Sequence, residues 1–386
     1  MKYLFSLLIV LIGCSLNAQN ISSGPMLGYN TMREVAVWVQ LDGQAEVALS
    51  YWDAEDPQNK ERSESLTTSR RHGYTATLIA EMLEPGTEYN YEILINGKAA
   101  DSGDTLGFKT QTLWHWRTDP PEFSFLAGSC MYINEPEYDR PGKPYGRSYS
   151  LLESMATEDA EFMVWLGDNT YFREVDWNSR SGLYHRYTHT RAVPELQGLL
   201  KKMHHYAIWD DHDYGPNDSD ETYWLKDQAL EAFKDFWANP NVGVNNQGGI
   251  TGSFIWNDCH FFLLDNRWNR GRPGKEGLLL GKEQIDWVIK SLRYTQASLK
   301  FICVGGQVIS DLDKFENHAV YKEERKYLLE QLDKYNLQGV VFLSGDRHSS
   351  EISKLVTEDG DVFYDITSSP LTSGSYDHKD EENNNR

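Results

Sequence analysis

The chain has 386 residues, enough for two or three domains of ordinary size. It carries 58 Asp and Glu against 37 Lys and Arg, a formal net charge of −21, and such a field would repel a phosphate backbone. We therefore expect no nucleic-acid-binding surface. The 40% of hydrophobic and 13% of aromatic residues can form a large core, which excludes a disordered protein, and four cysteines are too few for a disulfide scaffold.

Residues 1–20 have the pattern of a signal peptide. Lys2 precedes an apolar run over residues 4–12, which is too short to span a bilayer and suits a signal-peptide core. Two processing sites are possible. The segment ending at Cys14 resembles a lipobox, in which Cys14 would carry a lipid anchor. Alternatively, signal peptidase could cleave after Ala18. In both cases we expect export to the periplasm, the cell surface or the medium. Three cysteines then remain, so at least one is unpaired or bound to another group.

The next segment, residues 21–112, has the pattern of a β-sandwich. Apolar and polar residues alternate over 34–41 and 45–52, which is typical of half-buried strands. Residues 83–91 resemble the turn and strand of fibronectin type III domains, in which a tyrosine at the start of a strand bonds back to the corner. We expect a structural or substrate-orienting role for this domain.

Short segments border the remainder of the chain. Residues 113–122 look like a linker, and we expect Trp114 and Trp116 to dock on the following domain. Residues 377–386 are polar, and we expect a solvated tail without structure.

Between these segments, residues 123–376 have the alternating pattern of an α/β domain, with layered β-sheets flanked by helices. Helical spacing of apolar residues predicts helices near 225–236 and 328–332. The predicted strands are 123–127, 162–166, 206–209, 260–264, 301–304 and 340–343. We expect His204 and His205, which precede one of these strands, to lie at the surface.

Polar residues that can bind metals follow four of these strands. Ligands of α/β sheets bind beyond the carboxyl ends of the strands, so the side chains at these ends should meet at one rim. A glycine-rich turn at 305–307 lacks the lysine of a nucleotide-binding loop, and we expect it to line the same site. The candidate metal ligands are Cys130, Asp168, Tyr171, Asp210, Asp211, Asn217, Asp346 and His348.

The motifs at these strand ends resemble those of the PhoD-like alkaline phosphatases, a family of the calcineurin-like metallophosphoesterases. The resemblance covers essentially the whole mature chain, because the family also has a fibronectin-like N-terminal domain. Its motifs are Gly128–Cys130, Gly167–Tyr171, Trp209–Asp213, Asp265–Arg267 and Gly345–His348.

The resemblance implies a ferric iron bound by Cys130, Asp168 and Tyr171. A thiolate and a phenolate are strong anionic donors that suit a trivalent ion. Asp168 would bridge the iron to a second metal. Asp346 and His348 match the closing motif of the family. Most members of the superfamily have two histidines in this motif. The aspartate at position 346 replaces one of them and favours calcium.

The resemblance also implies calcium, with other divalent metals as alternatives. Asp210 and Asn217 match oxygen ligands, which calcium prefers. For Asp211 two roles stay open, because its carboxylate could bind metal or orient the neighbouring His212.

The mechanism that these metals imply is attack of metal-bound hydroxide on a phosphate ester. We expect His212 to protonate the leaving alkoxide, and the neighbouring carboxylates to hold it protonated. Arg267 could bind phosphate with two hydrogen bonds, or it could form a salt bridge with one of the many acids. Arg347 and Asn169 are further candidates for substrate binding.

The sequence therefore predicts an exported, monomeric phosphatase that acts on small phosphate monoesters, phosphodiesters or both. A phosphodiesterase specialised for nucleic acid or phospholipid is the alternative within enzymes. A surface binding protein that keeps its metals for structure is the alternative outside them.

Overall fold

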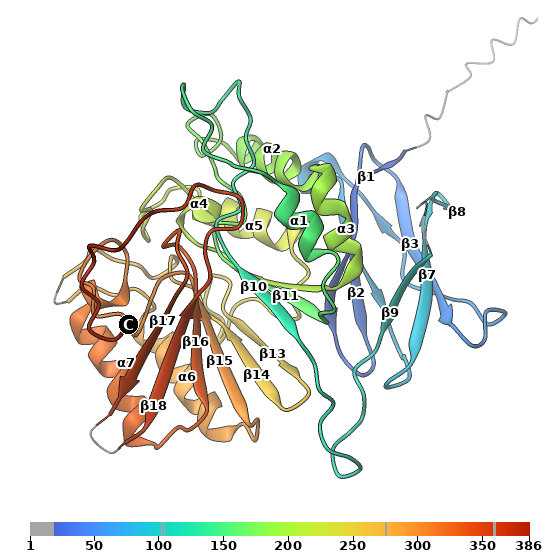
Figure 1. Ribbon diagram of the computed structural model, residues 1–386. Helices are drawn as coiled ribbons and strands as arrows, with labels where there is room; N and C mark the ends of the chain where they lie inside the picture. Colours follow the sequence, from blue (N-terminus) through green and yellow to red (C-terminus); the bar gives the residue numbers. More distant parts are fainter. Residues whose placement is uncertain (1–18, 102, 104, 275, 358–359) are drawn as a thin grey trace, which may run out of the picture.

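The computed structural model describes residues 19–386 except 102, 104, 275 and 358–359. It contains three β-sheets with helices around them (Figure 1). The predicted signal peptide, with Cys14 and Ala18, lies outside the described residues. Within the described ranges, none of the helices is long and apolar enough to cross a membrane.

The first sheet joins the N-terminal segment to the α/β part of the chain. Its strand order is β10-β11-β12-β1-β2-β6, and β1 runs parallel to β12 with Leu27 opposite His204. The hydroxyl of Tyr206 also accepts the backbone N–H of Asn30 at 3.1 Å. The strands are β1 (Ile21–Asn30), β2 (Val35–Leu41), β6 (Thr75–Ala80), β10 (Phe125–Gly128), β11 (Phe162–Leu166) and β12 (His204–Ile208).

The second sheet packs on β1, β2 and β6 and completes the predicted N-terminal sandwich. Buried aliphatic and aromatic residues of both sheets form one core. Tyr89 binds the corner as the sequence predicts, since its hydroxyl accepts the N–H of Glu84 at 2.9 Å. The strands are β3 (Glu46–Asp53), β4 (Glu61–Arg62), β5 (Leu66–Thr67), β7 (Glu88–Ile95), β8 (Lys98–Ala99) and β9 (Leu106–Lys109).

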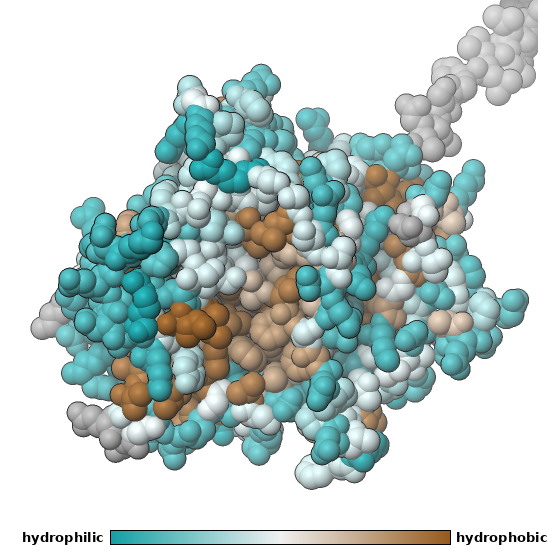
Figure 2. All heavy atoms as spheres, viewed as in Figure 1, coloured by the Kyte–Doolittle hydropathy of each residue, from teal (hydrophilic) through white to brown (hydrophobic). Residues whose placement is uncertain are grey.

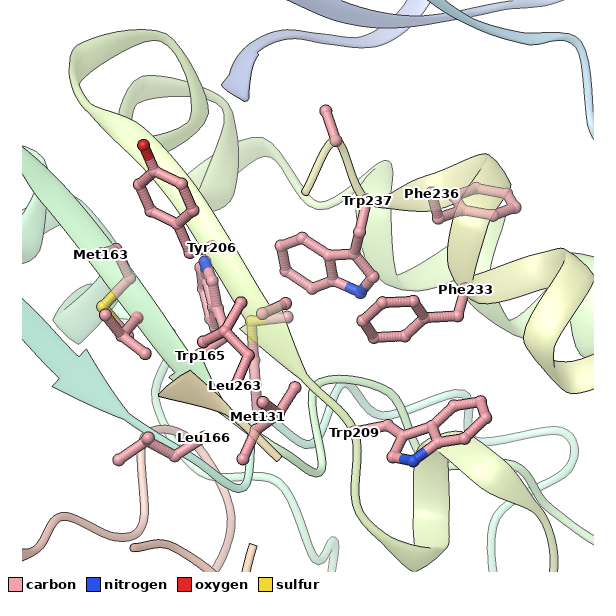
Figure 3. Packing of buried hydrophobic residues seen from close by; sticks show 14 of the residues in the cluster. Met131, Met163, Trp165, Leu166, Tyr206, Trp209, Phe233, Phe236, Trp237 and Leu263 are labelled. Atoms are coloured by element: carbon pink, nitrogen blue, oxygen red, sulfur yellow. The ribbon is translucent and has the colours of Figure 1, made fainter. Parts of the chain in front are cut away.

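The third sheet faces the first across an aromatic layer. Phe125 of β10 packs against Phe301 at 5.4 Å between ring centroids, and Phe162 against Phe261 at 5.3 Å. Figure 3 shows the adjoining core, in which Trp165 and Trp209 pack near Phe233 and Trp237. The strands, in the spatial order β13-β14-β15-β16-β18-β17, are β13 (Gly252–Trp256), β14 (Cys259–Leu263), β15 (Leu299–Val304), β16 (Val340–Ser344), β17 (Glu351–Val356) and β18 (Val362–Thr367).

Helices cover the outer faces of the first and third sheets (Figure 1). One group packs with the first sheet, and α6 and α7 share a core with the third. The α/β fold and all six predicted strands are confirmed, with bounds shifted by at most two residues. The helices are α1 (Ser150–Met155), α2 (Arg180–Arg191), α3 (Pro194–Lys202), α4 (Asp211–Tyr214), α5 (Lys226–Phe236), α6 (Lys282–Tyr294) and α7 (Lys322–Lys334), with short 3-10 turns η1 (Arg70–His72) and η2 (His318–Val320).

The prediction that His204 and His205 lie at the surface is wrong. Both are buried, and both ring nitrogens of His205 are bonded: Trp165 donates to Nδ1 at 2.9 Å, so Nε2 carries the proton and donates to the carbonyl of Leu199 at 3.0 Å. His204 donates from Nδ1 to the carbonyl of Gly28 at 2.8 Å. Burial lowers the pKa of His204 to about 4 and that of His205 to about 3. Both imidazoles are therefore neutral and hydrogen-bonded, and can lie buried where the N-terminal strands meet the α/β part of the chain.

The two tryptophans of the linker were predicted to dock on the following domain, and they differ in their surroundings. Trp116 is 99% exposed in a left-handed turn, which contradicts the prediction for this residue. Trp114 is half-buried, and its ring stacks on that of His115 at 3.9 Å between centroids. Trp114 also lines a cavity together with Tyr206 and Phe254 of the following domain, so its docking there stays a prediction.

Residues 377–386 form neither helix nor strand, yet they bond to the edge of the third sheet. The backbone N–H of Lys354 in β17 donates to the carbonyl of Asn385 at 2.7 Å, and Arg386 pairs with Glu351 at 2.8 Å. The expected solvated tail is therefore held along β17.

An apolar surface remains on one face of β17 and β18. Ile352 and Ile366 stand opposite each other on neighbouring strands and are 60% and 37% exposed. Figure 2 shows hydrophobic surface over this part of the third sheet and in the hollow beside it. Patches of this kind are uncommon on the surface of a soluble monomer.

The close contact between β1 and the end of α5 can be tested with a single added methyl group. A Cβ on Gly28 would overlap that of Ala238 and lie 3.0 Å from its carbonyl oxygen. We expect Gly28→Ala to lower the free energy of unfolding by about 2 kcal/mol, because a packed site must shift to make room. Gly43→Ala is the matched control, since its Cβ would meet only the flexible side chain of Gln19. Urea unfolding that gave equal stability for the two variants would contradict this packing.

Candidate metal centre

The candidate ligands lie where the central parallel strands end. Cys130 follows β10, Asp168 follows β11, Asp210 follows β12 and Asp346 follows β16. Cys130, Asp168 and Asp346 have left-handed backbones, with φ of 62°, 53° and 62°, as does His348 at 52°. Non-glycine residues adopt this conformation at a cost of about 1 kcal/mol or more, and strained residues of this kind cluster at functional sites. The folded chain thus turns sharply at these four positions, whereas Asp210 has an extended backbone.

The first cluster is formed by Cys130, Asp168 and Tyr171. The Oδ2 atom of Asp168 lies 3.6 Å from the thiol of Cys130 and 3.1 Å from the hydroxyl of Tyr171. Cys130, Asp168 and His348 each offer a ligand atom within 4.8 Å of the others. Burial, together with the charge of neighbouring acids, raises the pKa of Cys130, Asp168 and Tyr171 well above their usual values. These three groups would need positive charge nearby in order to ionise together.

Two further clusters continue from the first. Asp168, Asp211 and His212 form one, and Asp210, Asp211 and Glu316 form the next, again with ligand atoms within 4.8 Å. Asp168 belongs to the first two clusters and Asp211 to the last two. The potential ligand atoms are therefore continuous from Cys130 to Asp210, and Asp168 lies where a bridging ligand would be needed.

Asp213, which the sequence did not single out, binds the backbone of the site. Its carboxylate accepts the N–H groups of Asn169 at 2.9 Å, Thr170 at 3.1 Å and Asp210 at 3.0 Å. It therefore connects the loops that follow β11 and β12. Asp213 is the last residue of the acid-rich motif at 209–213. Its carboxylate accepts hydrogen bonds from backbone N–H groups and belongs to none of the three clusters.

Arg267 is placed behind the clusters and not on the wall of the cleft. Its guanidinium is fully buried, donates to Asp210 at 2.6 Å through Nε, and pairs with Glu316 at 2.9 Å through Nη1. The sequence left open whether Arg267 binds phosphate or forms a salt bridge. The geometry favours the salt bridge, and its partners Asp210 and Glu316 are buried. Glu316 had no sequence signal, because it lies in a loop without a motif.

A cleft of about 750 Å³ opens over Asp168, Asp211, His212 and Asp346. Asn217 also lines it and is exposed. The glycine turn lies close to the clusters as expected, since a Cβ on Gly305 would be 2.5 Å from the Oδ2 atom of Asp210.

Arg347 lies on the wall of the cleft and is held from two sides. Its Nη2 atom donates to both carboxylate oxygens of Glu381 at 2.8 and 2.7 Å. The guanidinium also lies 4.3 Å over the ring of Phe315. An arginine fixed in this way loses little conformational entropy when its remaining N–H groups bind an anion.

His212 differs from the expectation that neighbouring acids keep it protonated. Burial lowers its pKa, and the charge of Asp211 offsets this only in part. Its ring lies 4.2 Å from that of Tyr171, and its Nδ1 atom is buried without a hydrogen-bond partner among the described residues. The carboxylate of Asp211 bonds to the backbone N–H of His212 at 3.0 Å and not to its ring.

Comparison with known proteins agrees with this geometry. Residues 125–386 match the PhoD-like phosphatase family, and residues 18–112 match a domain family of unknown function. The chain belongs to the PhoD-like phosphatase family. Alkaline phosphatase D of Bacillus subtilis (strain 168) is 22% identical over 328 residues, which cover 72% of this chain and 53% of that protein. The chain thus spans about half the length of this curated relative.

Two solved structures share the fold of this PhoD-like chain. The structure of PhoD superimposes with a TM-score of 0.77 at 18% identity, over 92% of this chain and 78% of that one. The purple acid phosphatase PPD1 from yellow lupin (Lupinus luteus) seeds has a TM-score of 0.65 at 14% identity, over 95% of this chain and 66% of that one. The chain therefore shares the overall fold of these two structures.

The residues of the PhoD-like site fit metal cations by their own chemistry. Buried polar atoms without partners in the described part of the chain include Oδ2 of Asp210, Oδ1 of Asn169 and Oδ1 of Asn266. Buried polar atoms are normally bonded, so three unpartnered oxygens in one site indicate a missing positive group. Together with a thiol, a phenol and several carboxylates, they form a donor set suited to more than one cation.

Glu316 offers a test of the buried ion network behind the PhoD-like centre. Glu316→Ala would leave Arg267 and Arg270 without their shared carboxylate, and Arg267 is fully buried. We expect the free energy of unfolding to fall by about 3 kcal/mol, the usual cost of removing one partner from a buried ion network, although Arg267 keeps its bond to Asp210. The matched control is Glu323→Ala at an exposed position, which should change stability by less than about 1 kcal/mol. If thermal unfolding showed the same loss of stability for both variants, the buried ion network would not stabilise the fold as proposed.

Proposed function

We propose that this protein is an exported, metal-dependent phosphoesterase that hydrolyses small phosphate esters. The observation that carries the proposal is the continuous series of ligand atoms from Cys130 through Asp168 and Asp211 to Asp210 beneath an open cleft. Membership of the PhoD-like phosphatase family supports the same activity. The signal-peptide pattern of residues 1–20 supports export.

Cys130, Asp168 and Tyr171 are the proposed ligands of a ferric iron. Their sulfur and oxygen atoms lie within 3.6 Å of the shared carboxylate oxygen of Asp168, and a trivalent ion would allow all three to ionise despite their burial. His348 extends this group, because its ring is part of the same cluster.

Asp210, Asp211, Asn217 and Asp346 are the proposed ligands of calcium. They supply only oxygen atoms, which calcium prefers, and Asp168, which belongs to two of the clusters, would be shared between the two metals. Asp210 already offers one unpartnered oxygen, while Arg267 and Asn266 fix the other.

Cations bound at this rim would polarise a phosphoryl group and lower the pKa of water, so that hydroxide attacks phosphorus. Arg347 and Asn169 are the proposed substrate contacts. Arg347 lines the cleft with its Nη2 atom bonded to Glu381, and the amide of Asn169 is fixed by donation to the carbonyl of Ile208 at 2.8 Å. Arg267 then acts as a positioning residue for Asp210.

His212 is the proposed proton donor to the leaving oxygen. Its ring lines the cleft beside Asp168, as a group that meets the substrate must. Burial lowers its pKa in the free protein, but a bound phosphate dianion would raise it again, because an adjacent negative charge favours the imidazolium form.

The acids around the cleft favour small substrates over long polyanions. Asp218, Asp220, Asp377 and Glu381 line its walls together with the proposed ligands. These carboxylates would repel a nucleic acid, whereas a single phosphate group could reach the cations between them. Both monoesters and diesters remain in the proposed substrate class, and export as a lipoprotein or as a cleaved protein is compatible with it.

Metal content and colour test the proposal directly. We expect protein purified without chelator to contain iron and calcium, to show a visible tyrosinate-to-iron absorption band, and to hydrolyse nitrophenyl phosphate or its bis-ester. Tyr171→Phe should abolish the band. Tyr145→Phe is the matched control, because Tyr145 lies on the cleft wall without a bond to Asp168, and this variant should keep the band. A colourless protein that contains only zinc would overturn the assignment of Cys130 and Tyr171, and a fully metallated protein inactive on both esters would favour a binding protein.

The role of His212 can be tested through the leaving group. A nitrophenolate needs little protonation, whereas an alkoxide needs a proton in the transition state. We expect His212→Asn to lower kcat for an alkyl phosphate by about 100-fold or more, and to lower it much less for nitrophenyl phosphate. Equal losses on the two substrates would show that His212 does not supply this proton.

A further inference from the structure

Three aromatic side chains line the cleft above the candidate metal centre, and none of them is a proposed metal ligand. Phe315 is 63% exposed, Tyr376 is 62% exposed and Tyr145 is 38% exposed. Most of the other residues that line the cleft are charged or polar, so these rings are its large apolar side chains. We call the three residues the aromatic rim.

Phe315 keeps one face of its ring open at the cleft wall. Its backbone has a φ of 52°, a left-handed conformation that a bulky residue keeps only where the surrounding structure enforces it. The next residue, Glu316, anchors this loop, because its carboxylate pairs with the buried Arg267 at 2.9 Å. The guanidinium of Arg347 covers one face of the ring at 4.3 Å, and a side chain that is still 63% exposed has its other face open.

Tyr376 is held in a similar way by His348, the residue that follows Arg347. Its backbone N–H donates to the carbonyl of His348 at 3.0 Å, and its ring stacks on the imidazole with 5.0 Å between centroids and an angle of 28°. One face of the ring is covered in this way, and the 62% exposure of the side chain leaves the other face open. Tyr145 contacts the same imidazole, with 5.8 Å between centroids.

Both open faces lie beside the part of the cleft where we expect the phosphoryl group. Phe315 contacts Arg347, which is a proposed substrate contact. Tyr376 contacts His348, whose ring belongs to the same ligand cluster as Asp168. An ester whose phosphoryl group lies between Arg347 and that cluster therefore has its alcohol part beside the aromatic rim.

Aromatic side chains with an open face favour a planar partner. Pairs of aromatic rings attract each other beyond the apolar area that they bury, and nucleobases stack on aromatic side chains whatever their identity. A saturated ring has no such flat face, although it is at least as hydrophobic. Burial alone would thus select a saturated ring as readily as an aromatic one, and a preference for the aromatic ring indicates stacking.

We propose that the aromatic rim selects phosphate esters whose alcohol part carries a planar aromatic ring, supplied by a nucleobase or by an aryl group. The inference rests on the proposed function, since it concerns the substrate of the same cleft. The ring stacks on an open face of Phe315 or Tyr376, while the phosphoryl group lies beside Arg347. A mononucleotide fits this arrangement with a single phosphate, whereas the acids of the cleft would repel the further phosphates of a nucleic acid.

Two pairs of substrates test the proposal on the full-length protein. Benzyl phosphate and cyclohexylmethyl phosphate have leaving alcohols of the same size and similar basicity, and adenosine 5′-monophosphate differs from ribose 5-phosphate by its base. We expect kcat/KM to be higher for the aromatic member of a pair by about fivefold or more. A preference confined to one pair supports the proposal and shows whether an aryl group or a nucleobase supplies the ring. Equal values within both pairs, or a preference for the members without an aromatic ring, would overturn it.

The double variant Phe315→Leu/Tyr376→Leu tests the two rings, because leucine keeps an apolar side chain without an aromatic face. We expect it to abolish the preference, whereas a general loss of activity would lower both members of a pair alike and leave their ratio unchanged. Tyr294→Leu is the matched control, since Tyr294 is 87% exposed at the end of α6 and is not among the residues that line the cleft. It should keep the preference. A double variant that keeps the preference, or a control that loses it equally, would contradict the role of the aromatic rim.

Benzylphosphonate and cyclohexylmethylphosphonate separate this inference from the proposed function. Their carbon–phosphorus bonds resist hydrolysis, so calorimetric titration measures selection by the aromatic rim without turnover. If no ester is hydrolysed but benzylphosphonate binds more tightly, the proposed function fails and the rim still selects an aromatic ring. If the esters are hydrolysed and the two phosphonates bind equally, the proposed function holds and this inference fails.

Discussion

The mutual repulsion of buried carboxylates is the constraint on which this site depends. Asp168, Asp210, Asp211 and Asp346 converge at one rim, and burial raises the pKa of Asp168 and Asp346 well above the usual range. Arg267 offsets part of this charge from behind, together with the buried network that includes Glu316. Cations can offset the remainder, and a phosphoryl group is the third partner that we propose for cations held at an open cleft. The sharp backbone turns at the ligand positions, the shared sheet and the bonds of Asp213 all keep these acids together.

The sequence predicted the strands well, and it placed the candidate ligands at the strand ends, because both depend on local patterns. The apolar run 162–166 forms β11 with the predicted bounds, because the apolar side chains of a buried strand and the turns at its ends are both visible in the local sequence. The polar residues that follow it, Asp168 and Tyr171, then meet Cys130 because parallel strands end at one edge. The fold class could be inferred at this level, whereas the choice of iron and calcium rests on the resemblance to the family and stays a prediction.

What the sequence could not show depends on partners far along the chain. Arg267 was expected at the substrate or at the surface, and its real partner Glu316 lies 49 residues away in a loop without a motif. His204 and His205 look like surface residues until Gly28, Trp165 and Leu199 bond their rings. The tail beyond residue 376 is polar enough to be solvated, yet Glu381 fixes Arg347 at the cleft. In each case a polar residue is buried because a distant residue satisfies its hydrogen bonds or its charge.

We propose that this rim holds iron and calcium around a shared Asp168. The most direct test is a crystal structure of protein purified without chelator, with anomalous difference maps measured on both sides of the iron absorption edge. The account predicts an iron peak within bonding distance of Cys130, Asp168 and Tyr171, and a second cation without an iron edge on the far side of Asp168. An empty rim in an active protein, or metal ions bound only to exposed acids elsewhere, would contradict it.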